Sequence, residues 1–231
     1  MKRGAQNFKM KIACLHTAQS NVAVFEEAAQ ELGLPDGALH HEVRPDLLLA
    51  AEDAGGLTPE LERETASILR LLSQEADAVI LTCSTLGPSV DGLEESTTVP
   101  VMRADAALAE QALDAGGTTI ALCAVETTIK PTTELFAEAA KRSGASFEVR
   151  LVPGAWALFK AGKYDAYLSD IARAADAAYS DGATTVALAQ ASMAGAVDLV
   201  KCGPKPLTSP IAGLRAVLDQ ISERHQDAGW P

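Results

Sequence analysis

The chain is poor in aromatic residues, in cysteine and in positive charge. Aromatic residues make up 4% of its 231 residues and hydrophobic residues 48%, so a core must be built from Ala, Val, Leu and Ile. The four cysteines form no CxxC pair, which argues against a disulfide framework or a structural zinc site. The net charge of −12 argues against nucleic acid or an anionic membrane as a partner.

Long apolar runs are also missing. No stretch approaches the length of a membrane span, and the basic start of the chain lacks the apolar segment of a signal peptide. We therefore expect a cytoplasmic protein that acts on a small molecule. An anionic ligand is compatible with the negative net charge, because backbone dipoles in a pocket can outweigh distant surface charges.

Short apolar stretches alternate with segments that have helical periodicity. This alternation predicts an α/β fold of mostly parallel sheets flanked by helices. One helix has a clear start, because Thr58 is a suitable N-cap and Pro59 fits the first helical position. The expected strands are residues 11–16, 39–43, 78–81, 99–102, 119–123, 146–152 and 185–189.

The two halves of the chain resemble each other when Cys83 is aligned with Gln190. The repeat predicts two pseudo-symmetric lobes with a ligand cleft between them, in which these two residues face each other. We assign residues 1–98 and 208–231 to the first lobe, whose final helix returns to it, and residues 99–207 to the second. The aligned pairs include Val79 with Val186, Leu81 with Leu188 and Asp91 with Asp198.

Residues 78–91 carry the chemistry expected of a site. A buried strand ends in Thr-Cys-Ser-Thr and is followed by Gly87 and Pro88. Ligands of open α/β sheets bind beyond the carboxyl ends of strands, where free backbone N–H groups can receive an anion. A thiol is reactive as its thiolate, and nearby N–H groups would lower the pKa of Cys83.

Three motifs together carry a family resemblance: TCSTLG at 82–87, AVETT at 124–128 and LAQASM at 188–193. In this order and spacing the chain resembles the aspartate/glutamate/hydantoin racemase superfamily over essentially its whole length. The resemblance implies a two-lobed enzyme without a cofactor, a small carboxylate bound between the lobes, and a homo-oligomer. No metal is expected.

In the two-base members of that superfamily, one cysteine from each lobe acts as an acid/base pair. By resemblance Cys83 is the first of these, but the second position falls on Gln190 or Ala191, which do not titrate. His16 could supply the missing acid because histidine titrates near neutrality, or it could merely hydrogen-bond the next turn. The remaining substrate-binding candidates are Thr17, Ser84, Thr85, Thr127, Thr128, Gln190, Ser192 and Met193.

His40 and His41 point to opposite faces of their strand, so together they predict no metal site.

Three functions are consistent with the sequence patterns described above. The first is a racemase-like isomerase that acts at the carbon next to a carboxylate, with Cys83 as acid/base. The second is a decarboxylase of a malonate-like acid, for which one thiol suffices to protonate the carbanion. The third is a non-catalytic binder of small carboxylates, in which Gln190 replaces acid/base chemistry with hydrogen bonding.

Overall fold

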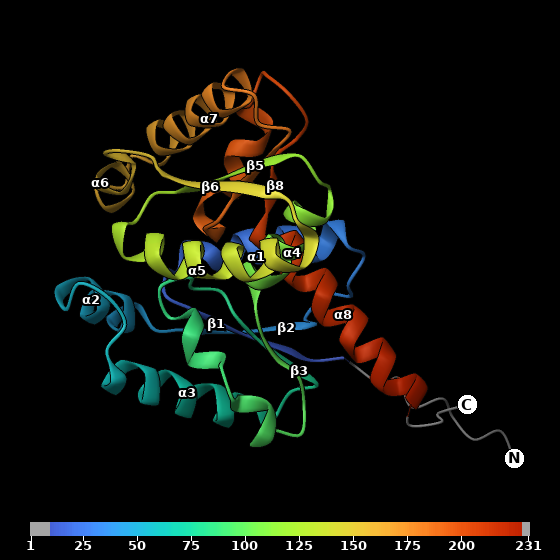
Figure 1. Cartoon of the computed structure of the whole chain (residues 1–231). Helices are drawn as coiled ribbons and strands as arrows, with labels where there is room; N and C mark the ends of the chain where they lie inside the picture. The colour runs from blue at the N-terminus through green and yellow to red at the C-terminus, as the bar shows by residue number, and fades with distance from the viewer. Residues whose placement is uncertain (1–9, 228–231) are drawn as a thin grey trace, which may run out of the picture.

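The computed structural model describes residues 10–227, and within this range two four-stranded parallel sheets form the framework (Figure 1). The first sheet has the order β2-β1-β3-β4. Its strands are β1 (Ile12–His16), β2 (Leu39–Val43), β3 (Ala78–Leu81) and β4 (Val101–Arg103). The central strands β1 and β3 are fully buried, as expected of strands covered on both faces.

The second sheet repeats the first, with the order β6-β5-β7-β8. Its strands are β5 (Thr118–Cys123), β6 (Ser146–Leu151), β7 (Thr185–Leu188) and β8 (Leu207–Thr208). Every neighbouring pair in both sheets is parallel. The predicted α/β class and the predicted pseudo-symmetric lobes are thereby confirmed.

Helices on the outer faces complete each lobe. The first sheet is covered by α2 (Pro45–Asp53) and α3 (Pro59–Ser73), and the second by α6 (Ala155–Lys160) and α7 (Tyr164–Ser180) (Figure 1). Helix α3 starts as its sequence predicts, because the Thr58 hydroxyl accepts the N–H of the third helical residue at 3.3 Å.

Four helices lie between the two sheets: α1 (Ser20–Glu31), α4 (Ala104–Asp114), α5 (Glu126–Ser143) and α8 (Ser209–Asp227) (Figure 1). The helix that follows each lobe's last strand packs on the sheet of the other lobe. Helix α4 shares a core with β5 and β7, and α8 packs on β1 and β3 as the sequence predicted for the final helix.

Helices α4 and α8 approach closely at Gly213. A Cβ on this glycine would lie 2.8 Å from the Cα of Ala104, so only glycine permits this packing distance. Three short 3₁₀ helices complete the chain: η1 (Gly87–Val90), η2 (Leu93–Glu95) and η3 (Ala191–Leu199). Both η1 and η3 begin just beyond the turns that carry Cys83 and Gln190.

The lobe boundary differs from the prediction. We assigned residues from 99 onward to the second lobe, but β4 pairs with β3, with Val101 beside Val79, and so belongs to the first sheet. A three-residue strand carries too little periodicity to reveal its partner, whereas hydrogen bonding to β3 does. Residues 1–9 and 228–231 of the predicted first lobe lie outside the described range.

Candidate functional site

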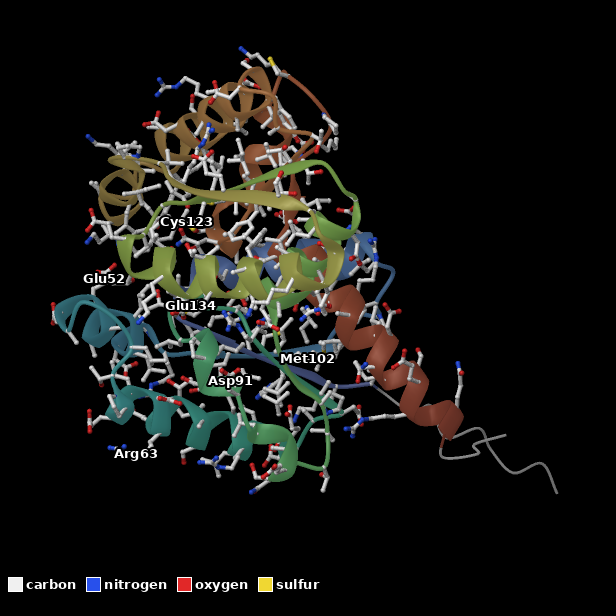
Figure 2. The ribbon with its side chains drawn as sticks, viewed as in Figure 1. Glu52, Arg63, Asp91, Met102, Cys123 and Glu134 are labelled. Atoms are coloured by element: carbon white, nitrogen blue, oxygen red, sulfur yellow. The ribbon has the colours of Figure 1, made fainter. Side chains whose placement is uncertain are left out.

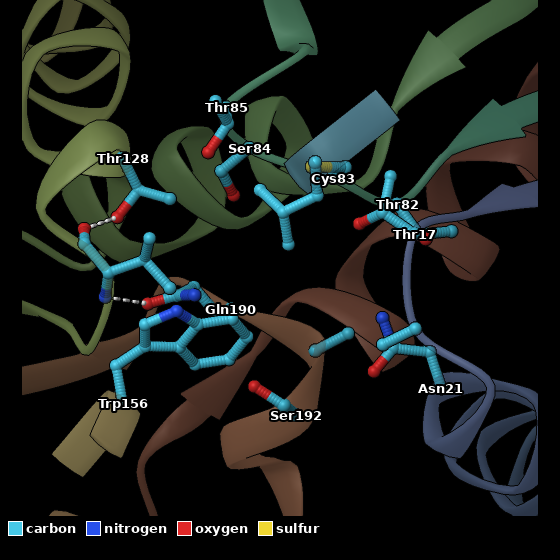
Figure 3. Close-up of a pocket in the computed structure, with 14 residues that line it drawn as sticks. Thr17, Asn21, Thr82, Cys83, Ser84, Thr85, Thr128, Trp156, Gln190 and Ser192 are labelled. Carbon is cyan, nitrogen blue, oxygen red and sulfur yellow. Dashed lines mark hydrogen bonds between the residues drawn. The ribbon is translucent and has the colours of Figure 1, made fainter. Parts of the chain in front are cut away.

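A cleft between the lobes is lined by the turns that follow β1, β3, β5 and β7, with contributions from α1, α2, α5, α6 and η3. The cavity enclosed between these side chains measures about 30 Å³, so the lobes are closed on each other. The lining residues, drawn in Figure 3, are Thr17, Ala18, Asn21, Leu48, Thr82, Cys83, Ser84, Thr85, Val125, Thr128, Trp156, Gln190, Ala191 and Ser192.

Cys83 lies two residues beyond the end of β3, with 8% of its surface exposed. Burial raises the pKa of Cys83 above its ordinary value, while the Thr17 hydroxyl and the backbone N–H groups of Thr85 and Leu86 act in the opposite direction and do not outweigh it. The expected N–H groups are therefore present, but the expected lowering of the pKa is wrong for the closed cleft. Cys83 is a neutral thiol in this state.

A buried ion pair supports the turn that carries Cys83. Arg103 Nε and Nη2 each donate to a carboxylate oxygen of Asp105 at 2.9 Å. The guanidinium lies against Gly87, where a Cβ would come within 2.3 Å of Nη2. Burial alone would lower the pKa of Arg103, but Asp105 and, to a smaller extent, Asp91 and Cys83 raise it. The pair therefore acts on Cys83 chiefly through the Asp105 carboxylate, whose charge adds to burial in raising the pKa of the thiol.

Gln190 occupies the equivalent position in the second lobe (Figure 3). Its Oε1 accepts the backbone N–H groups of Ala124 at 2.5 Å and of Val125 at 3.1 Å. These two bonds fix the side-chain amide and leave its Nε2 hydrogens for a ligand. Among the fourteen lining residues, all within the described part of the chain, Cys83 is the only one that titrates.

Hydroxyl groups join the two lobes across the cleft. Ser84 Oγ donates to the Ala189 carbonyl at 3.0 Å, and the Oγ1 atoms of Thr85 and Thr127 are 3.1 Å apart. Thr128 Oγ1 donates to the Val125 carbonyl at 2.6 Å. The predicted hydroxyls of Ser84, Thr85 and Thr127 therefore take part in bonds between the lobes, and that of Thr128 in a bond within the second lobe.

A second contact between the lobes lies at the rim. Glu52, on α2, lies where the first lobe faces the second (Figure 2). Its carboxylate accepts the indole N–H of Trp156 and lies 3.5 Å from Lys160 Nζ, both on α6. Trp156 could not be predicted as a site residue, because nothing in the α6 sequence indicates that this helix reaches α2.

Two further polar groups face the cleft. Asn21, at the start of α1, has a buried Oδ1 with no hydrogen-bond partner within residues 10–227. Of residues 17–21, only Thr17 was predicted as a site residue from the sequence, and Asn21 was not. Ser192 Oγ lies 2.8 Å from the hydroxyl of Tyr167 on α7, and Figure 3 shows Ser192 on the opposite side of the cavity from Cys83.

Three of the predicted site residues do not line this cavity. Thr127 lines a neighbouring cavity of about 380 Å³ that also contacts Trp156. Met193 is fully buried in the core beneath α7, because the 3₁₀ turn directs its side chain away from the cleft. His16 is fully buried and does not line the cleft; burial, followed by the charge of His41, lowers its pKa to about 3. His16 is therefore not positioned for a direct acid/base role in the cleft, and Met193 is not positioned to contact a substrate.

The fold and cleft are those of a two-lobed α/β protein of the racemase type. The chain belongs to the Asp/Glu/Hydantoin racemase family, whose sequence model matches residues 45–212. Comparison with curated protein sequences gives no match.

Solved structures share the fold at low sequence identity. A glutamate racemase from Bacillus anthracis is 13% identical with a TM-score of 0.65, over 95% of this chain and 83% of that one. An allantoin racemase from Pseudomonas fluorescens is 19% identical with a TM-score of 0.61, over 93% and 92%. An aspartate racemase from Picrophilus torridus is 11% identical with a TM-score of 0.64, over 92% and 94%. Within residues 10–227 no helix is both long and apolar enough to cross a membrane.

Proposed function

We propose that the protein is a cofactor-independent isomerase of the racemase type, which moves a proton at the carbon next to the carboxylate of a small amino acid. The observation that carries the proposal is the position of Cys83 as the single titratable side chain of an interlobe cleft, in a member of a racemase family. Membership supports the racemase-type reaction, and the cleft supports Cys83 as its acid/base.

Two amides at the cleft favour an amino acid over a simple acid. The Nε2 hydrogens of Gln190 suit a substrate carboxylate, because Oε1 is already held by two backbone N–H groups. The unpartnered Oδ1 of Asn21 suits a substrate ammonium group, which would satisfy a buried acceptor that otherwise costs stability. A carboxylate and an ammonium on one carbon match both groups.

Cys83 would act on one face of that carbon. As thiolate it takes the α-proton, which forms the S–H bond and leaves the electron pair of the C–H bond on carbon. The Ser192 hydroxyl, on the other side of the cleft, then donates its proton to the carbanion, and Tyr167 replaces that proton. After release, solvent returns a proton to the Tyr167 oxygen and takes the proton from the Cys83 sulfur, which restores the thiolate. One proton is thus removed from one face of the carbon, and another is added to the opposite face.

A decarboxylase of a malonate-like acid is the second candidate, and the raised pKa of Cys83 favours it. Loss of CO₂ leaves a carbanion, and a neutral thiol is the form that can protonate it. This reaction needs one titratable group, which is the number the cleft provides.

Proton exchange in deuterated water separates these functions. We would incubate the protein with small amino acids, dicarboxylic acids and substituted malonates, and follow the α-proton by NMR, optical activity and CO₂ release. α-Proton exchange with racemization supports the isomerase, and CO₂ release supports the decarboxylase. Ligand binding without either reaction would contradict both and leave the carboxylate binder. The Cys202→Ser variant is the matched control, because Cys202 is an exposed cysteine far along the chain from these motifs.

We further propose a homo-oligomer in the cytoplasm, as expected from the family resemblance and the composition. Light scattering of the purified chain tests the first part, and fractionation of cells that produce the protein tests the second.

A further inference from the structure

Three side chains with metal-binding atoms meet on the inner face of the first sheet, away from the cleft. Cys14 on β1 stands in register with His41 on β2, and His16 lies two residues beyond Cys14 on the same face. The sulfur of Cys14 and one nitrogen from each histidine lie within 4.8 Å of one another. Cys14 and His16 are fully buried, and the His41 side chain is 14% exposed.

The outer nitrogen of each histidine has a partner that orients the ring. Thr82 Oγ1 donates to the Leu15 carbonyl at 3.0 Å, so it must accept from His16 Nδ1, 2.9 Å away. This assigns the proton of a neutral His16 to Nδ1 and leaves a lone pair on Nε2. Nε2 lies 2.8 Å from His41 Nδ1, on the side of the cluster.

His41 is held in the same way by a carboxylate. Its Nε2 donates to Glu26 Oε1 on α1 at 2.9 Å, which leaves Nδ1 directed at the cluster. Histidines that bind metals typically give their other N–H to a carboxylate, hydroxyl or carbonyl, which fixes the ring and raises its basicity. Both histidines of this cluster have such a partner.

We propose that Cys14 Sγ, His16 Nε2 and His41 Nδ1 form a zinc-binding site. A thiolate with two imidazoles is a donor set that zinc prefers, and a solvent molecule would complete a tetrahedron. The Cys14 thiolate and the Glu26 carboxylate together balance the two positive charges of the ion.

The present spacing is compatible with entry of the ion. With Zn–N bonds of about 2.0–2.1 Å, two tetrahedral nitrogen ligands lie about 3.3 Å apart. The two facing nitrogens are 2.8 Å apart around a shared proton, so the ion replaces that proton after the rings separate by roughly half an ångström. The proton of the Cys14 thiol and the shared proton pass to solvent. The partly exposed Glu26, at 39%, marks the side from which the ion enters.

This site would tie β1 and β2 together beneath α1. It would also reach the cleft, because His16 is hydrogen-bonded to Thr82, which precedes Cys83 and lines the cavity. The inference does not depend on the proposed reaction, since its ligands are not lining residues of the cleft.

Metal titration of the full-length chain tests the site. After treatment with a chelator, Zn²⁺ binding is measured by calorimetry, and Co²⁺ is used as an optical probe. We expect one Zn²⁺ per chain, a rise in melting temperature with Zn²⁺, and a near-ultraviolet thiolate-to-cobalt band with visible bands of tetrahedral Co²⁺. Cys14→Ser should remove the thiolate band, and Glu26→Gln should weaken Zn²⁺ binding about 10–100-fold.

Cys202→Ser is the matched control and should keep the band, because Cys202 is exposed and outside the cluster. If Cys14→Ser does not fold by circular dichroism, His41→Gln, at a half-buried position, replaces it and should also abolish stoichiometric binding. Absence of Zn²⁺ binding by the folded wild-type chain would overturn the site. So would a thiolate band that disappears in Cys202→Ser, or binding that is unchanged in His41→Gln.

Discussion

The turns after β3 and β7 occupy equivalent places in the two lobes but carry different chemistry. The first presents the thiol of Cys83, while the second presents Gln190, whose amide oxygen is bound to two backbone N–H groups. The support differs as well. The residues of the second lobe that correspond by register to Arg103 and Asp105 are Thr208 and Pro210, so only the first lobe has this buried ion pair. Repetition of the backbone therefore does not require repetition of the chemistry, and the two faces of a ligand meet different groups.

The largest effect should follow from removing the group that distinguishes the first turn. In Cys83→Ser a hydroxyl replaces the thiol and cannot titrate in the accessible pH range, so we expect kcat/KM to fall about 10²–10⁴-fold. The assay is α-proton exchange or CO₂ release on whichever substrate the screen identifies. Cys202→Ser should be unaffected. Full turnover in Cys83→Ser would show that the asymmetry of the turns has no part in catalysis.

Removing the buried ion pair that supports the first turn should have the next largest effect. Arg103→Met leaves the Asp105 carboxylate buried without its partner, and we expect the free energy of unfolding to fall by about 3–5 kcal/mol. Arg142→Met is the matched control, because its pair with Glu110 is exposed and is worth about 0–1 kcal/mol. Urea unfolding measures both. Equal losses in the two variants would contradict a special role of the buried pair.

Removing the anchored amide of the second turn should have a smaller effect. Gln190→Ala leaves the N–H groups of Ala124 and Val125 without their acceptor, which we expect to cost about 1–3 kcal/mol of stability. Substrate affinity should fall as well, since the Nε2 donor is lost, while the pH dependence set by Cys83 stays in place. Calorimetric titration with the substrate and urea unfolding give the two numbers. Unchanged affinity would remove Gln190 from the binding site.

The pH dependence of the reaction reports which protonation state of Cys83 is used. Because burial raises the pKa of Cys83, the thiol keeps its proton at neutral pH. A reaction that needs the thiolate should therefore gain rate as the pH rises, up to about tenfold per pH unit below that pKa. A reaction that needs the thiol should be constant at neutral pH and decline only in the alkaline range. The profile of kcat/KM distinguishes the isomerase from the decarboxylase, and Cys83→Ser should lose the titration in either case.

Much of the fold could be predicted because its signals are local. The buried run before Cys83 and the cap at Thr58 each depend on neighbouring residues, and the repeat that pairs Cys83 with Gln190 can be found by comparing the two halves of the sequence. The cluster of Cys14, His16 and His41 was missed because it depends on which strand lies beside β1 and in what register. His40 and His41 were correctly separated onto opposite faces, but the partners of His41 come from another strand.

Parts of the candidate site were missed for a similar reason. Trp156 and Asn21 reach the cleft from helices whose packing direction no local pattern reveals. The pKa of Cys83 could not be predicted either, since the depth of its burial depends on how far the lobes close. Met193 shows the converse, because a residue within a recognised motif can point into the core.

The closed cleft has a consequence for isotope labelling. A cavity of about 30 Å³ bridged by Ser84 and Thr85 has room for only one or two water molecules, so a proton taken by Cys83 exchanges with bulk solvent mainly after the lobes part. A substrate labelled with tritium at the α-carbon should therefore recover part of its own label on the face served by Cys83, and carry solvent hydrogen on the other. The fraction of label returned then measures how often the lobes open during one catalytic cycle.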